Sequence, residues 1–188
     1  MKDYEAYRRT QMEDGLLFQD FVVDLAWQAG LAITQYASRT YQLAIGESRT
    51  GVEIKHDKRR KHTGRLCIET AEKAWPRPGP YAPAGIMRDG HWLYAIGDYD
   101  IVYFLPTKFL RALHAVQNGQ GKPRYRRYEI ETSQGFLLPE ADGEKYAALV
   151  LRPNAEDKVD RTVKNLEDVA RDLRNALSDN PAQRTMFS

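Results

Sequence analysis

The chain has 188 residues, and its 28 Lys and Arg against 26 Asp and Glu give a formal net charge of +2. Hydrophobic residues make up 42% and charged residues 29%, a balance typical of a folded chain and not of a disordered one. No apolar run approaches the roughly 20 residues that a membrane-spanning helix needs, and the polar start does not resemble a secretory signal. The single cysteine, Cys67, excludes an internal disulfide, so we expect a reduced, cytoplasmic compartment.

Apolar residues at helical spacing predict helices over 15–29, 106–116 and 156–177, and the charged segment 3–14 is expected to form a short solvated helix before them. The pair Asp14-Gly15 is expected to end the first helix, and Gly30 stands where a glycine closes the second. Pro106 can occupy the first turn of the third. The fourth helix would serve as a dimer face or as part of the core.

Alternating and β-rich segments predict strands over 32–45, 52–57, 66–73, 91–96, 100–105, 125–131, 135–138 and 146–151. The fourth and fifth of these form a hairpin that turns at Gly97-Asp98. This order predicts a mixed α/β (α+β) fold with a mainly antiparallel sheet flanked by helices. We expect one domain over 1–178, with its core at about 13–116 and further strands and a helix over 124–178, followed by a flexible tail over 179–188.

The candidate chemistry lies on the strand 52–57 and the strand after it. Alternation places Glu53, Lys55 and Asp57 on one strand face, and Glu69 on the corresponding face of the next strand. If the two strands pair through the turn at 58–65, Asp57 and Glu69 approach one another. Because two close carboxylates repel, a hard divalent cation such as Mg²⁺ or Mn²⁺ would stabilise them.

Two basic clusters would attract a polyanion such as DNA. The first comprises Lys58, Arg59, Arg60, Lys61 and Arg65, and the second Arg124, Arg126 and Arg127. Each feature taken alone is also typical of an ordinary solvated surface. Their coincidence with the carboxylates favours a functional interpretation.

The remaining residues show no other catalytic pattern. The histidines lack metal-ligand spacing, and no phosphate-binding glycine loop is present. We expect His56, on the core side of its strand, to be packed or hydrogen-bonded, and Trp27, Trp75 and Trp92 to be core or packing residues.

The run Gly51-Val52-Glu53-Ile54-Lys55-His56-Asp57, followed after eleven residues by Glu69 in Leu66-Cys67-Ile68-Glu69-Thr70, resembles the PD-(D/E)xK nuclease superfamily. These are metal-dependent phosphodiesterases that include restriction enzymes and junction resolvases. The resemblance covers about residues 13–116. It implies a restriction-endonuclease-like core and the activity of a Mg²⁺- or Mn²⁺-dependent DNA endonuclease. It also implies a bacterial or phage-infected cell as the location, and a homodimer as one oligomeric state open to the chain.

Carried over by position, the resemblance makes Asp57 the first acid and Glu69 the second, both binding the metal. Glu53 would be an additional metal ligand or a supporting carboxylate. Gln19 or Asp20, on the upstream helix, could add an outer ligand.

The sequence departs from the family pattern at the lysine. The expected position, two residues after the second acid, is Ala71. Either Lys55 or Lys73 would then orient the attacking water. A second register takes Glu53-Ile54-Lys55 as the acid-x-lysine element, with Glu47 as the first acid.

The C-terminal run places Gln183 three and four residues before Met186 and Phe187. It resembles the short peptide by which bacterial DNA-processing proteins bind the sliding clamp. The main hypothesis is therefore a metal-dependent endonuclease. The alternatives are a non-catalytic nucleic-acid-binding or clamp-associated adaptor on the same fold, and a protein-interaction domain.

Overall fold

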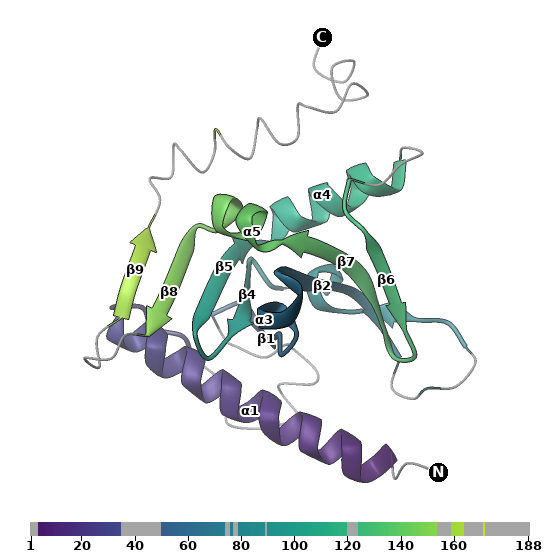
Figure 1. Cartoon of the computed structure of the whole chain (residues 1–188), viewed down its shortest axis with the longest axis horizontal. Coiled ribbons are helices and arrows are strands. Elements are labelled where there is room, and N and C mark those ends of the chain that lie inside the picture. The colour runs from purple at the N-terminus through teal and green to yellow at the C-terminus, as the bar shows by residue number, and fades with distance from the viewer. Residues whose placement is uncertain are drawn as a thin grey trace.

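Helices flank two β-sheets in this chain, for which a computed structural model describes residues 4–34, 50–73, 76, 79–88, 90–119, 124–153, 159–163 and 171 (Figure 1). The helices are α1 (Tyr4–Gln28), α3 (Arg60–Thr63), α4 (Thr107–Gly119) and α5 (Glu140–Tyr146), with a 3-10 turn η1 (Gly85–Met87). The strands are β1 (Val52–His56), β2 (Arg65–Glu72), β3 (Ala82–Pro83), β4 (Leu93–Asp98), β5 (Ile101–Pro106), β6 (Arg127–Ile130), β7 (Ser133–Pro139), β8 (Leu149–Pro153) and β9 (Val159–Val163). The predicted mixed α/β class is confirmed. None of these helices is long and apolar enough to cross a membrane.

The first sheet has the order β1-β4-β5-β8-β9, and the second has the order β3-β2-β7-β6. Among the strand pairs that the structure describes, β1 and β4 are parallel and the others, in both sheets, are antiparallel. The hairpin expected over 91–105 is confirmed as β4 and β5. Its turn lies at Tyr99-Asp100, so the turn expected at Gly97-Asp98 is wrong, because both of these residues pair with β5.

The expectation that β1 and β2 pair with each other is wrong. Val52 of β1 lies beside Leu93 of β4, whereas Ile68 of β2 lies beside Phe136 of β7. The two strands bury their apolar residues in different cores, so a hairpin could not satisfy both. The short helix α3, closed by the left-handed Gly64 (φ 61°), turns the chain from one sheet into the other.

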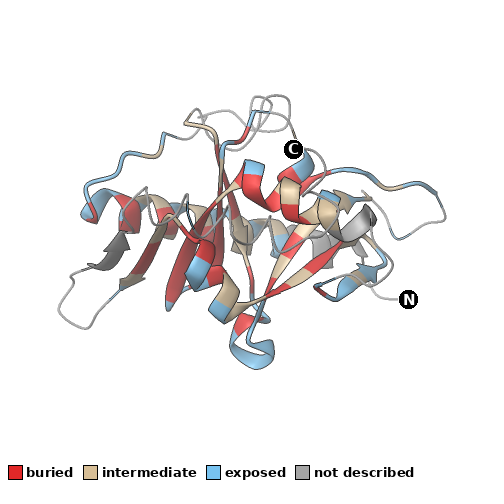
Figure 2. Cartoon of the chain, turned by 90° about the horizontal axis from the view of Figure 1, so that it is seen from above, coloured by how far each residue is buried: buried red, intermediate tan, exposed pale blue. Residues whose placement is uncertain are grey.

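Two cores hold the layers together, and Figure 2 shows buried residues concentrated along the strands. Helix α1 packs against one face of the first sheet through Phe18, Val22, Leu25, Ala26, Val52, Ile54, Ala95, Val102, Phe104 and Leu151. The larger core joins the two sheets, α4 and α5 through Leu66, Ile68, Ile86, Tyr94, Ile96, Tyr103, Leu105, Phe109, Leu110, Leu113, Tyr125, Phe136, Leu138, Tyr146 and Val150. Each additional buried side chain of this kind contributes about 1.5–3 kcal/mol before the entropy cost of ordering it.

Helix α1 runs without interruption through Asp14-Gly15, so the expected break is wrong. Glycine in a helix costs only about 1 kcal/mol relative to alanine, less than the packing of α1 on the sheet supplies. Gly30 adopts the left-handed conformation expected after the helix end (φ 83°). Trp27 (72% exposed) and Trp92 (61% exposed) are not core residues, contrary to expectation.

The C-terminal part differs most from the prediction. Helix α5 occupies residues 140–146, where no helix was expected, and β9 pairs with β8 inside the segment predicted as the helix 156–177. Val159 and Val163 are four residues apart, which fits one face of a helix, but Val and Thr also favour strands. The edge of β8 offers backbone hydrogen bonds to a further strand, and this explains why a strand forms here. Three predicted segments lie wholly or mostly outside the described residues: the strand 32–45, the remainder of the helix 156–177 except Arg171, and the tail 179–188.

Candidate active site

Three charged side chains, two from β1 of the first sheet and one from β2 of the second, meet in this structure. The Lys55 Nζ atom lies 2.9 Å from Glu53 Oε1 and 3.5 Å from Glu69 Oε2. Glu53 and Lys55 share a face of β1 because they are two residues apart, and β2 supplies Glu69 from the second sheet. We refer to Glu53, Lys55 and Glu69 as the acid–lysine cluster.

Glu53 is fully buried, so it is not one of the solvent-exposed charged residues that usually alternate along the outer face of a strand. Its second oxygen, Oε2, lies 3.3 Å from Nδ1 of the buried His91, and neither carboxylate oxygen accepts a hydrogen bond of regular geometry. Burial lowers the pKa of His91 despite the opposing effect of Glu53, so the imidazole is neutral near pH 7. The countercharge of Glu53 in this contact is therefore Lys55, because a buried carboxylate requires a paired cation.

Backbone geometry and hydrogen bonds fix Glu69. Ser133 Oγ donates to Glu69 Oε1 at 2.9 Å, and the Tyr128 hydroxyl lies 3.3 Å from the same serine oxygen. A β-bulge follows Glu69 in the β2–β7 ladder. Gly85 approaches the bulge so closely that an added Cβ would lie 2.4 Å from the Glu69 carbonyl oxygen, at a φ of +52° that favours glycine. Bulges commonly re-aim side chains in this way beside functional sites.

A pocket of about 220 Å³ opens beside Lys55 and Glu69 of the cluster, whereas the buried Glu53 does not line it. It is lined by Lys55, His56, Asp57, Cys67, Glu69, Glu72, Tyr94, Ile96 and Tyr128. Within the described part of the chain, the buried hydroxyl of Tyr94 has no hydrogen-bond partner. Burial raises the pKa of Tyr94 well above its usual value, so the phenol stays protonated and can donate to a ligand.

Asp57 lines the same pocket, but backbone groups hold its carboxylate. Oδ2 accepts from the Cys67 N–H at 2.7 Å, and Oδ1 accepts from the Arg59 N–H at 3.0 Å. Asp57 therefore joins the end of β1 to the start of β2. Its assignment as the first metal-binding acid stays a prediction. Burial raises the pKa of the Cys67 thiol to about 12, as suits an unreactive cysteine.

The two candidate lysines lie in different surroundings. Lys73 Nζ lies 4.1 Å from the ring centroid of Tyr81, whereas Lys55 contacts both carboxylates of the cluster. Helix α1, with Gln19 and Asp20, packs on the sheet face that carries Val52 and Ile54, opposite the cluster. Glu47, the first acid of the second register, lies outside the described residues.

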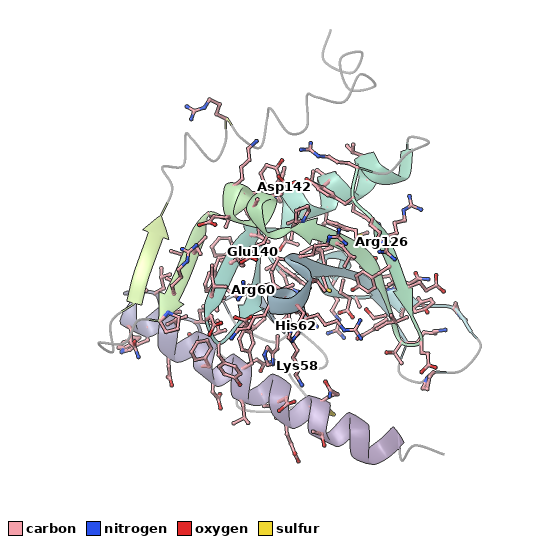
Figure 3. All side chains as sticks on the ribbon, viewed as in Figure 1. Lys58, Arg60, His62, Arg126, Glu140 and Asp142 are labelled. Carbon is pink, nitrogen blue, oxygen red and sulfur yellow. The ribbon has the colours of Figure 1, made fainter. Side chains whose placement is uncertain are left out.

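The first basic cluster forms an exposed surface on and around α3, except for Arg60. Lys58, Arg59, Lys61 and Arg65 are exposed, whereas Arg60 is buried. Arg60 bonds to Asp98 and to Glu140 of α5, so its charge is neutralised inside the fold and the expectation that it faces a ligand is wrong. In Figure 3 Arg60 lies near Glu140, while Lys58 and His62 lie nearer α1.

Partners inside the fold constrain two of the exposed lysines. Lys58 bonds to Gln11 (3.2 Å) and Asp14 of α1, and Lys61 forms an ion pair with Asp100. The first contact ties the basic surface to the N-terminal half of α1.

The second basic cluster lies on and just before β6, an edge strand of the second sheet. Arg124, Arg126 and Arg127 are all exposed, and Arg124 bonds to the Tyr146 hydroxyl at 3.3 Å. Figure 3 shows Arg126 apart from Lys58 and His62. Gln183, Met186 and Phe187 of the suggested clamp-binding peptide lie outside the described residues.

Sequence reasoning missed His91, Tyr94 and Ser133 as neighbours of the cluster. Tyr94 lies beside Glu53 only because β1 and β4 are parallel, and Ser133 reaches Glu69 only because β2 pairs with β7. No local pattern signals either pairing. His56 follows expectation, since it stacks on Phe18 with ring centroids 4.4 Å apart.

Among the described residues, no group of three or more His, Cys, Asp or Glu side chains is arranged to hold a metal ion. The chain matches no protein-family model, and comparison with curated proteins and with solved structures finds no match.

Proposed function

We propose that this protein is a metal-dependent DNA endonuclease that hydrolyses phosphodiester bonds at the acid–lysine cluster. The observation that carries the proposal is the meeting of Glu53, Lys55 and Glu69, of which Lys55 and Glu69 line a pocket together with Tyr94, whose buried hydroxyl has no hydrogen-bond partner among the described residues. The pocket is lined by the carboxylates of Asp57, Glu69 and Glu72 against the single lysine Lys55, and this excess of negative charge favours a bound cation.

The donor set fits a hard divalent cation. The oxygens of Glu53 are buried and accept no regular hydrogen bond, and Glu69 reaches the same lysine from the other sheet. Mg²⁺ is bound through one or two carboxylates and completes its shell with water and phosphate oxygens, so two protein carboxylates suffice. Glu53 and Glu69 would hold the ion, with Asp57 beside them. A bound Mg²⁺ or Mn²⁺ supplies Lewis-acid stabilisation of charge on the phosphate.

The protein's own groups would position the reactants. The Lys55 ammonium group can donate hydrogen bonds to the attacking water or to a phosphate oxygen, and so fix the angle of attack. Tyr94, protonated and without a partner, can donate to a second phosphate oxygen. Ser133 holds the Glu69 carboxylate in place while these contacts form.

The exposed basic surface of α3 supports DNA as the substrate class. Lys58, Arg59, Lys61 and Arg65 lie on and next to α3, which connects the two acid-bearing strands, and the pocket residues Asp57 and Cys67 flank this segment in the chain. Binding through these charges should weaken steeply with added salt, because each neutralised phosphate releases counterions.

A cleavage assay tests the proposal. Wild type should cut labelled DNA with Mg²⁺ or Mn²⁺ and not with EDTA. Glu53→Gln, Glu69→Gln and Lys55→Met should each lower the rate by about 10²- to 10³-fold, the usual effect of removing one preorganised electrostatic group. Glu72→Gln is the matched control, since Glu72 lines the same pocket but is exposed.

Three outcomes separate the hypotheses. Cutting that survives all three cluster variants would refute the site. Cutting that is lost in Asp57→Asn but kept in Glu53→Gln would instead assign the Asp57–Glu69 pair. Salt-dependent DNA binding without cutting of any substrate would favour the non-catalytic adaptor.

A further inference from the structure

The second basic cluster is divided between the two faces of the second sheet, in which β2, β7 and β6 lie side by side (Figure 1). The Leu137 N–H donates to the Arg126 carbonyl oxygen at 2.9 Å, and Leu137 is in turn paired with Cys67 of β2. Directly opposed residues point to the same face of a sheet, so Arg126, Leu137 and Cys67 share one face. Tyr125 and Arg127, the neighbours of Arg126 in the chain, belong to the other face, where Tyr125 is buried in the larger core.

The face that carries Arg126 is also the face that carries Glu69. Along β2, Arg65, Cys67 and Glu69 alternate with buried residues of the larger core, so these three side chains point together away from that core. Tyr128, two residues after Arg126, lines the small pocket together with Cys67 and Glu69. Arg65 and Arg126, both exposed, therefore lie on the pocket side of the second sheet.

The other two arginines of the second basic cluster are directed elsewhere. Arg124 donates to the Tyr146 hydroxyl at 3.3 Å, and its guanidinium group lies 5.5 Å from the centre of the Tyr125 ring. Arg127 lies on the face that α4 covers, where its charge adds to the effect of burial in lowering the pKa of His114. Neither side chain is thus placed to bind a ligand beside Glu69.

We propose that Arg65 and Arg126 form a phosphate-binding site next to the acid–lysine cluster, which holds the DNA strand beyond the phosphate that is cut. The inference rests on the proposed nuclease function and narrows its substrate class to a strand that continues past the cleaved bond. Arg126 is two strands and two residues away from both Arg65 and Glu69. With strands about 4.8 Å apart and a rise of about 3.4 Å per residue, each of these separations is about 12 Å across the sheet.

The charges on this face suit a polyanion that crosses it. Arg59 lies near Cys67, since its charge opposes the rise in the pKa of that thiol, and with Arg65 and Arg126 it borders the acidic pocket. The side chains between Arg65 and Arg126 are those of Cys67 and Leu137, which are neutral and do not compete with a phosphate for the arginines. A guanidinium group binds phosphate oxygens in a bidentate manner, so two arginines can each hold one phosphate.

Equilibrium binding of the full chain to fluorescein-labelled DNA tests the proposal, with EDTA present so that no cutting occurs. One phosphate contact contributes a salt slope of about 0.7 for a single strand and 0.9 for a duplex, or about 5-fold and 8-fold in affinity at about 0.1 M salt. Arg65→Gln and Arg126→Gln should each weaken binding to an oligothymidylate and to a duplex by these factors. The double variant should lose about 25- to 60-fold, because the two sites are separate. Arg126→Lys should keep the salt slope of wild type, since the slope counts charges.

Arg127→Gln is the matched control, because it removes the same charge from the neighbouring exposed residue on the opposite face. It should leave both the affinity and the salt slope unchanged. Equal effects of Arg126→Gln and Arg127→Gln would overturn the proposal, as would wild-type affinity of Arg126→Gln or no DNA binding by wild type. Arg126-dependent binding without metal-dependent cutting would reject only the nuclease, and cutting with no effect of Arg126 on binding would reject only this phosphate site.

Discussion

Replacing Arg60 by methionine should destabilise the fold strongly, because this arginine connects three elements from inside. Its Nε and Nη2 atoms donate to the two oxygens of Asp98 at 2.9 and 3.1 Å, and its Nη1 donates to Glu140 at 2.5 Å. The side chains of Arg60 and Asp98 are only 10% and 8% exposed. Arg60 thus joins α3 to the β4–β5 turn and to α5.

The magnitude follows from what the substitution leaves behind. Burial alone would raise the pKa of Asp98, but hydrogen bonds from Arg60 and from the Asp100 N–H outweigh it and lower the pKa. Without Arg60, the Asp98 carboxylate is buried without a cation, and removing one partner of such a pair costs about 3–5 kcal/mol. Glu140 is one-third exposed and adds little, since water can solvate it.

Urea denaturation followed by circular dichroism measures the loss. Arg59→Met is the matched control, because its neighbour Arg59 is exposed and should change the free energy of unfolding by less than about 0.5 kcal/mol. Adding Asp98→Asn to Arg60→Met should restore part of the loss, since asparagine is uncharged and keeps an acceptor for the Asp100 N–H. An Arg60→Met protein as stable as Arg59→Met would refute the reasoning.

Three further predictions follow from the structure. Burial lowers the pKa of three histidines, His56, His91 and His114, so the folded protein binds fewer protons than the unfolded chain below about pH 6.5. The free energy of unfolding, measured in urea, should therefore decrease as the pH is lowered from about 8 to about 5, and an increase over this range would contradict the reasoning. Gly85→Ala should cost about 1–3 kcal/mol and disturb Glu69, whereas Gly15→Ala, in open space on α1, should not destabilise; equal thermal midpoints would contradict the close contact. Cys67, whose pKa is about 12, should react with iodoacetamide at about pH 8 far more slowly in the folded protein than in urea, and equal rates would show that the thiol is accessible and ionisable.

The sequence predicted which side chains share a strand face, but not which strands are neighbours. Alternation correctly assigned Val52 and Ile54 to a core and Glu53 and Lys55 to the opposite face, because the side-chain period of a strand is a local property. The partner of β1 is β4, reached only after about forty intervening residues, and nothing near Val52 encodes that choice. The prediction that Glu69 lies near Lys55 is therefore correct, but the hairpin between β1 and β2 from which it was argued does not exist.

The helix errors have a similar origin. Gly15 has a low intrinsic helix propensity, yet α1 continues through it because Phe18 and Val22 pack against the first sheet. At the C-terminus, the spacing from Val159 to Val163 fits a helix, and the edge of β8 decides for a strand. In both places a contact distant in sequence outweighs the local preference.

The burial of Glu53 argues that the acid–lysine cluster is not retained for stability. The neighbouring side chains on the same face, Tyr94 and Ile96, are buried in the larger core, so an apolar residue at position 53 would pack there without any desolvation cost. The carboxylate instead requires Lys55 as its countercharge, and that same lysine extends toward Glu69 and the open pocket. Because charges act more strongly in a low-dielectric surrounding than at an exposed surface, a phosphate in this pocket would interact with a preorganised field. Burying the Glu53 carboxylate beside an apolar core costs desolvation free energy, and its countercharge Lys55 faces a pocket. A strand with a purely structural role would not need to bear that cost.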